Sequence, residues 1–178
     1  MTETRSVFLQ DGDVVLRPVE KEDAEFLRDL SIHPEVRDTI GRAPKPRNIK
    51  QTEEVIEEIK DSNDRRFVIE YQGERAGDCS IVDIDSDFYR GEIGISVHPE
   101  MHNQGIGSKT VQLLLKYGFE TLNLHCIRGG YLEGNEASRR IMEKAGMKEE
   151  GTKRDYKLVQ REWKDVIYMS ILESEYRG

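Results

Sequence analysis

The chain has little cysteine and no long apolar run. Only Cys79 and Cys126 occur among its 178 residues, far apart and without a Cys-x-x-Cys pair. Two isolated thiols fit free cysteines in a reducing compartment better than a disulfide framework, with a regulatory disulfide as the rarer alternative. No apolar stretch approaches the roughly 20 residues that cross a bilayer, and the first residues lack the pattern of a secretion signal. We therefore expect a soluble, cytoplasmic protein without a membrane partner.

Several signatures of catalysis and binding are missing as well. The four histidines form no i, i+4 pair within a predicted helix and no cluster with cysteine or carboxylate at ligand spacing, so we expect no metal. There is no Gly-x-Ser-x-Gly elbow for a nucleophilic serine. The net charge is −8 and no basic face is concentrated in the sequence, which argues against a nucleic-acid partner. Negative charge favours a cationic acceptor such as an amine, or simply keeps the chain in solution.

What remains is a globular composition with 36% hydrophobic and 35% charged residues. The apolar residues are concentrated in periodic segments, and no linker, repeat or low-complexity stretch divides them. We predict helices over 21–30, 51–62, 105–121 and 135–145. Strands are predicted over 14–18, 66–71, 76–84, 92–97, 124–132, 147–155 and 164–172, the first at a sheet edge because Pro18 ends it. The chain is predicted to form a single α+β domain over 1–178.

The stretch 91–108, GEIGISVHPEMHNQGIGS, joins a short strand to the third helix through a loop that contains glycine. A helix N-terminus offers unpaired backbone N–H groups and the positive end of the helix dipole, where a pyrophosphate can bind. Gly105 and Gly107 lack a Cβ and allow close approach of such an anion. Neither the dinucleotide fingerprint nor the P-loop spacing is complete, so a simple turn before a core helix stays an equal alternative on these residues alone.

A longer pattern resolves this alternative. His102-Asn103-Gln104-Gly105-Ile106-Gly107 resembles the Arg/Gln-x-x-Gly-x-Gly/Ala loop of the GCN5-related N-acetyltransferases (GNAT). Three later segments resemble elements of that family in the right order: Asn135-Glu136-Ala137-Ser138, Glu143-Lys144-Ala145-Gly146-Met147 and Glu150-Gly151. The likeness extends over nearly the whole chain, from Leu16-Arg17-Pro18 to the last predicted strand. The chain is most similar to the RimJ/RimL-like branch, which acetylates N-terminal amines of ribosomal proteins, and to spermidine acetyltransferases.

The resemblance implies a fold and a cofactor. The fold is a GNAT-type domain whose mixed, mostly antiparallel sheet of about seven strands is flanked by about four helices. The cosubstrate is acetyl-CoA, and its pyrophosphate would be held by the loop residues His102, Asn103, Gln104, Gly105, Ile106, Gly107 and Ser108. His102 departs from the family's arginine or glutamine but keeps an N–H donor. The pantetheine arm would pair with the backbone of Ser96, Val97 and His98, and Asn135 would cap its helix and contact the arm.

The resemblance also implies catalytic roles. Val97 N–H would stabilise the oxyanion, and Glu92 would act as the base, directly or through water. An ion pair of Glu92 with Arg66 or Arg90 is the structural alternative. Met142 replaces the family's usual tyrosine, so the donor for the thiolate is predicted to be Ser138, as in the ribosomal-protein branch, with Tyr131 and Tyr156 as fallbacks.

The acceptor stays open at the level of the sequence. An N-terminal amine of a protein or peptide is our first prediction, because Met142 counts against the tyrosine-dependent polyamine enzymes. Spermidine or another small amine is the alternative, favoured by the glutamates of helix 51–62, Glu53, Glu54, Glu57 and Glu58. A sensor that binds acyl-CoA without turnover is a third alternative. The sequence does not fix the oligomeric state, and a homodimer is one alternative.

Overall fold

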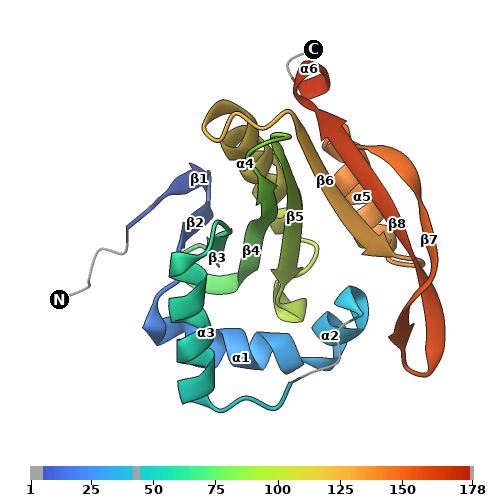
Figure 1. The fold of residues 1–178 in the computed structure, drawn as a ribbon. Helices are drawn as coiled ribbons and strands as arrows, with labels where there is room; N and C mark the ends of the chain where they lie inside the picture. The colour runs from blue at the N-terminus through green and yellow to red at the C-terminus, as the bar shows by residue number, and fades with distance from the viewer. Residues whose placement is uncertain (1–5, 42–44, 177–178) are drawn as a thin grey trace.

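A computed structural model describes residues 6–41 and 45–176. These residues form one sheet of eight strands in the order β1-β2-β3-β4-β5-β6-β8-β7 (Figure 1). All neighbouring strands are antiparallel except β5 and β6, which are parallel. The strands are β1 (Leu9–Asp11), β2 (Val14–Pro18), β3 (Arg65–Tyr71), β4 (Glu74–Asp85), β5 (Arg90–Val97), β6 (Cys126–Leu132), β7 (Lys148–Val159) and β8 (Glu162–Leu172). The predicted mixed α+β architecture is confirmed, with one strand more than expected.

The same residues form six α-helices and two short 3₁₀ helices. They are α1 (Ala24–Ile32), α2 (Pro34–Ile40), α3 (Ile49–Asp61), α4 (Ile106–Glu120), α5 (Glu136–Lys144), α6 (Glu173–Tyr176), η1 (Lys21–Asp23) and η2 (Pro99–Met101). None of these helices has the length and apolarity that a bilayer span requires. The four predicted helices are confirmed within a few residues; α2 and α6 were not predicted. Pro34 lies just after α1 and occupies the first turn of α2, where its missing N–H costs nothing.

The short strand β1 changes the position of β2 in the sheet. The sequence predicted strand 14–18 at an edge, which is wrong, since β2 pairs with β1 on one side and β3 on the other. Gly12, with φ +58°, allows the tight turn between the two strands. Pro18 is tolerated because it is the last residue of β2.

Helix α4 packs against one face of the sheet and carries the largest share of the core. Nine of its residues are buried, including Leu114, Leu115 and Phe119. They contact the strand residues that point to this face, such as Leu16, Ile81 and Ile93. Helix α5 lies beside α4 and against β6. The face that α4 covers is therefore the apolar side of the domain.

Helix α2 is held at the other side of the sheet by the hairpin of β7 and β8. Lys157 Nζ donates a hydrogen bond to Ile40 O at 2.6 Å, at the C-terminal end of α2. Gln160, at the hairpin turn, donates to the Asp38 carboxylate. A cation at a helix C-terminus is favourable, because unpaired carbonyls and the negative end of the dipole lie there. The distant end of the chain thus positions a short helix near the N-terminus.

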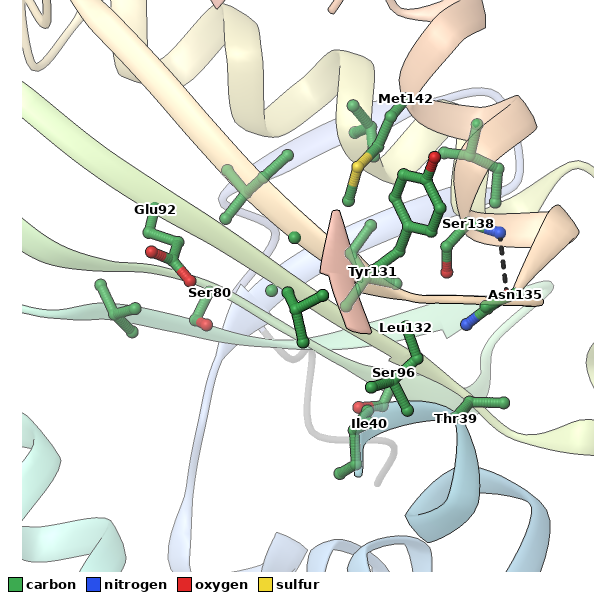
Figure 2. Close-up of a pocket in the computed structure, with 18 of the residues that line it drawn as sticks. Thr39, Ile40, Ser80, Glu92, Ser96, Tyr131, Leu132, Asn135, Ser138 and Met142 are labelled. Atoms are coloured by element: carbon green, nitrogen blue, oxygen red, sulfur yellow. Dashed lines mark hydrogen bonds between the residues drawn. The ribbon is translucent and has the colours of Figure 1, made fainter. Parts of the chain in front are cut away.

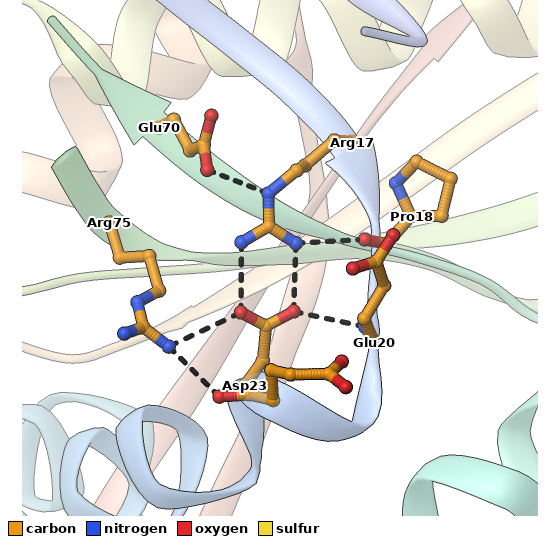
Figure 3. Close-up of polar contacts among 7 residues, drawn as sticks. Arg17, Pro18, Glu20, Asp23, Glu70 and Arg75 are labelled. Atoms are coloured by element: carbon orange, nitrogen blue, oxygen red, sulfur yellow. Dashed lines mark hydrogen bonds and ion pairs between the residues drawn. The ribbon is translucent and has the colours of Figure 1, made fainter. Parts of the chain in front are cut away.

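A buried ion network joins β2 to the start of α1 (Figure 3). Arg17 and Asp23 are both 1% exposed. The Arg17 guanidinium donates to both Asp23 oxygens, at 2.7 and 2.8 Å, and to Glu70 Oε1 on β3 at 2.7 Å. Asp23 also accepts from Glu20 N at 2.9 Å, and Arg75 NH1 lies 3.4 Å away. The network therefore fixes the position at which the chain leaves the sheet and begins its N-terminal helices.

Burial raises the pKa of the Asp23 carboxyl, but hydrogen bonds from Arg17 and Glu20 and the charges of Arg17 and Arg75 outweigh it. The net pKa therefore lies below its ordinary value. A carboxyl with a lowered folded-state pKa contributes stability that is present above its unfolded pKa of about 3.9. That stability is lost as the pH falls through the folded-state pKa.

We predict that Asp23→Asn lowers the free energy of unfolding by about 3 kcal/mol at pH 7, because it removes the carboxylate that pairs with two nitrogens of the buried Arg17 and leaves Glu70 as the remaining partner of that charge. Urea unfolding followed by circular dichroism measures this. The matched control is Asp29→Asn, whose carboxylate pairs with Arg28 at 2.7 Å but is 56% exposed. That change is expected to cost less than about 1 kcal/mol. The difference in unfolding free energy between wild type and Asp23→Asn should become smaller as the pH falls below about 4. A difference that does not change with pH would contradict the account.

Candidate active site

The pairing of β5 with β6 stops early, and this creates the site. The two strands pair only from Arg90 to Glu92 on β5 and from Cys126 to Arg128 on β6. Beyond Glu92 the strands diverge (Figure 1), although β5 stays paired with β4 up to Val97. The β6-facing backbone groups of β5 are therefore left without a strand partner over this segment.

A cavity of about 320 Å³ opens at the divergence, on the sheet face that carries Glu92. We call it the sheet cavity (Figure 2). Polar and charged side chains from β3, β4, β5 and the C-terminal hairpin line it, together with residues of α2 and α5. The residues of the lining include Thr39, Arg66, Asp78, Ser80, Glu92, Gly94, Ile95, Ser96, Tyr131, Asn135, Ser138, Ile141, Met142 and Lys157.

A second cavity of about 350 Å³, the loop cavity, runs along η2 and the N-terminus of α4. Its lining includes Val97, His102, Asn103, Gly105, Ile106, Gly107, Ser108 and Arg140. Six residues line both cavities: Thr39, Ile95, Ser96, Asn135, Ser138 and Ile141. The two cavities therefore adjoin where β5 and β6 separate. Most of the predicted loop residues line the loop cavity, whereas His98 and Gln104 line neither.

The N-terminus of α4 opens into the loop cavity. Gly105 is the N-cap, with φ +77°, and no side chain caps the helix there. A Cβ on Gly105 would meet no atom within 4 Å, so the space above its backbone is open. Asn103 also has a positive φ, of 62°. The first N–H groups of α4 are thus left for an anion, which the helix dipole also attracts.

Backbone hydrogen bonds decide which groups of β5 face the gap. His98 N donates to Ala76 O at 2.8 Å, on the β4 side. Because successive residues of a strand point their N–H and C=O groups to opposite sides, the Val97 groups point toward β6. His102 Nε2 lies 3.0 Å from Val97 O and carries the proton, since a carbonyl only accepts. Of the predicted trio Ser96, Val97 and His98, it is Val97 whose N–H is directed into the gap.

Glu92 lies on the edge of the sheet cavity and forms an ion pair. Arg128 Nε donates to Glu92 Oε2 at 3.1 Å, across the last paired position of β5 and β6. The Glu92 side chain is 26% exposed and that of Arg128 45%. The partner is thus Arg128 instead of the Arg66 or Arg90 considered from sequence. Figure 2 shows the Glu92 side chain on the cavity side of the sheet, with Ser80 near it.

Ser138 lies in the first turn of α5 and lines both cavities (Figure 2). Asn135 Oδ1 accepts a hydrogen bond from Ser138 N at 3.1 Å, which confirms Asn135 as the predicted N-cap. Tyr131 extends beside Ser138 and Met142 in Figure 2, and burial raises the pKa of its phenol, which stays protonated at neutral pH. Tyr156 is 50% exposed beside Lys153, on the outer strand β7. Of the two fallback donors, Tyr131 is the one in the cavity.

Several lining residues were not predicted as site residues from the sequence, although Arg66 was considered as an ion-pair partner of Glu92. Arg66, Asp78 and Ser80 share a sheet face with Glu92 only because of the register between β3, β4 and β5. Arg140 lines the loop cavity, and its place one turn after the N-cap Asn135 is a signal that sequence reasoning passed over. The glutamates of α3 line neither cavity, and Glu57 pairs instead with Lys60 at 3.0 Å and Lys21 at 3.7 Å. Among the described residues, no group of three or more His, Cys, Asp or Glu side chains could hold a metal.

Known proteins are similar to this chain in sequence and in fold. A family model described as an acetyltransferase (GNAT) domain matches residues 13–148. The chain is 29% identical to the spermidine N(1)-acetyltransferase of Escherichia coli K12, with 92% of this chain and 88% of that one covered. It is 30% identical to the putative ribosomal N-acetyltransferase YdaF of Bacillus subtilis, with 93% and 94% covered.

A solved structure extends the likeness to three dimensions. The spermidine N-acetyltransferase of Vibrio cholerae, crystallised with CoA and spermine, superposes with a TM-score of 0.88 at 26% identity, covering 94% of this chain and all of that one. The match of the family model over most of the chain, together with the divergent β5 and β6 and the open N-terminus of α4, identifies this chain as a member of the GNAT acetyltransferase family.

Proposed function

We propose that the protein transfers an acetyl group from acetyl-CoA to a primary amine, and that this amine is the N-terminus of a protein or peptide. The observation that carries the proposal is the junction of the two cavities at Ser96, Asn135 and Ser138. A cofactor that lies in the loop cavity would bring its thioester to this junction. An acceptor in the sheet cavity would meet it there, in the same cavity that Glu92 lines.

The cofactor's pyrophosphate would lie at the N-terminus of α4, where the N–H groups after Gly105 are uncapped. Arg140 supplies a cation in the lining of the same cavity. The Val97 N–H, pointing into the gap, would donate to the thioester oxygen as negative charge develops on it. One such donor lowers the barrier by about 3 to 4 kcal/mol.

The reaction is a direct attack. A peptide α-ammonium has a pKa of about 8 and an alkylammonium a pKa of about 10, so either acceptor is mostly protonated at neutral pH. A base therefore has to remove one proton before the amine nitrogen can attack the acetyl carbon. Glu92 takes this proton, directly or through water. The new C–N bond forms and the C–S bond breaks. The Ser138 hydroxyl gives its proton to the CoA thiolate and takes the second proton that the amide nitrogen loses, so that the serine is restored. No acyl-enzyme is required.

A polyamine acceptor is the second candidate, and the similarity to spermidine acetyltransferases favours it. The charges of the sheet cavity do not favour it, because its lining has the cations Arg66 and Lys157 as well as the anions Asp78 and Glu92. The glutamates of α3, which would attract a polycation, lie outside both cavities. We therefore keep the N-terminal amine as the principal proposal.

The first prediction concerns the transfer itself. Purified protein should release CoA thiol from acetyl-CoA when a peptide with a free N-terminus is present, and release should fall when that N-terminus is blocked. A thiol-reactive dye measures release over a panel of peptides, polyamines and alkylamines, beside calorimetry with acetyl-CoA. Binding of acetyl-CoA without release for any amine would contradict the transferase and favour a sensor.

The second prediction concerns Glu92. Glu92→Gln should lower kcat/KM by about 10² to 10⁴, because the general base is lost, while CoA affinity stays unchanged. The matched control is Arg128→Gln, which breaks the same ion pair but keeps the carboxylate. If Glu92 were only structural, the two variants would lose similar activity. If Glu92 is the base, Arg128→Gln keeps most of its activity.

The third prediction concerns Ser138. Ser138→Ala should lower kcat at pH 7, and the deficit should shrink above pH of about 9, where a thiolate with a pKa of about 8.5 needs no proton donor. Tyr131→Phe is the control and should lose less at pH 7. A deficit in Ser138→Ala that is constant between pH 7 and 10 would mean that the hydroxyl only positions α5.

A further inference from the structure

A row of polar positions crosses the sheet cavity from β3 to β5. Arg66 pairs with Ser80 on β4, and Ser80 pairs with Gly94 on β5. Alternate residues of a strand share a face, so Glu92, two residues before Gly94, lies on the same face. All four residues line the sheet cavity. The cavity floor thus has a carboxylate at one end and a guanidinium at the other.

Arg66 has hydrogen-bonding capacity that the protein does not use. Its Nε is buried and has no hydrogen-bond partner in the described structure. Its NH2 approaches Asp64 Oδ2 at 3.5 Å, at the outer limit of a hydrogen bond. An unpaired N–H group of a half-buried guanidinium costs free energy unless a ligand accepts from it. The second cation of the lining differs, since Lys157 already donates to Ile40 O.

The geometry allows one small molecule to reach both charges. Arg66 lies two strand spacings from Gly94, about 10 Å between backbones, and an extended arginine side chain covers more than half of that distance. Gly94 has no side chain to fill the space between, and a Cβ there would approach Ser80 Oγ at 3.3 Å. A ligand whose amine lies near Glu92 would therefore have room to place an oxygen near Arg66 and the Ser80 hydroxyl.

We propose that Arg66 determines acceptor specificity by donating hydrogen bonds to a carbonyl or carboxylate oxygen close to the reacting amine, as in the first residues of a peptide. Guanidinium groups match such oxygens in charge and in geometry. A polyamine has no such oxygen and would instead bring a second cation toward Arg66. This inference rests on the proposed amine acetylation and adds the residue that selects among amines.

The test compares Arg66→Met with wild type on two acceptors: a short peptide, and an alkylamine of similar length without oxygen. Removing a hydrogen bond to a charged group should lower kcat/KM for the peptide by about 10- to 100-fold. The alkylamine should change less than about threefold. Arg65→Met is the matched control, because Arg65 is next to Arg66 on β3 and points to the opposite face. It should leave the ratio of the two acceptors unchanged.

If Arg66→Met lowered kcat/KM equally for both acceptors, or changed it for neither, the proposed role of Arg66 would be overturned. Amine acetylation itself would still stand. A second measurement does not depend on turnover. CoA joined through an acetyl bridge to the peptide amine, or to the alkylamine, is titrated into each variant by calorimetry. Arg66→Met should weaken the peptide conjugate alone by about 10-fold or more and leave free CoA unaffected. If wild type acetylates no amine, transfer fails as a function, and the two conjugates still decide whether Arg66 selects the oxygen.

Discussion

The site depends on one constraint: β5 continues past the point at which β6 turns away. Paired strands satisfy each other's backbone groups, so the segment of β5 after Glu92 keeps N–H and C=O groups that need another partner. Residues of the loop after β5 and the first turn of α4 line the adjoining cavity, so the helix N–H groups lie close to these strand groups. One elongated ligand with a hydrogen-bonding arm and an anionic end can satisfy both sets. The separation of two strands thus explains the form of the proposed cofactor site.

The rest of the fold holds the walls of that opening in place. The network of Arg17, Asp23 and Glu70 fixes the chain where it leaves β2 for the N-terminal helices. Lys157 and Gln160, on the distant β7 and β8 hairpin, hold α2, whose Thr39 lines both cavities. The acceptor side is therefore built from segments more than a hundred residues apart in the chain.

The sequence predicted the features whose signals are local. The apolar stripe of α4, Gly105 before it and Asn135 at the start of α5 all emerged from spacing and residue type. Features that depend on the register between strands could not be predicted in this way. Arg66 reaches the sheet cavity because β3, β4 and β5 align it with Ser80 and Gly94, and a bulge at Ile69 and Glu70 contributes to that alignment. The ion pair of Glu92 with Arg128 depends on a parallel pairing that no short-range pattern reveals. Helix α2 was missed because Pro34 has the same local signal whether it ends one helix or begins another.

Amide hydrogen exchange, resolved by residue with and without CoA, tests the central claim most directly. The claim is that the unpaired backbone of β5 and the N-terminus of α4 hold the cofactor together. CoA should slow exchange at Val97 and at the first amides of α4, from Ile106 to Ser108, and leave the outer strand β7 unchanged. Protection confined to other segments, or unchanged exchange at Val97 when CoA is bound, would contradict the account.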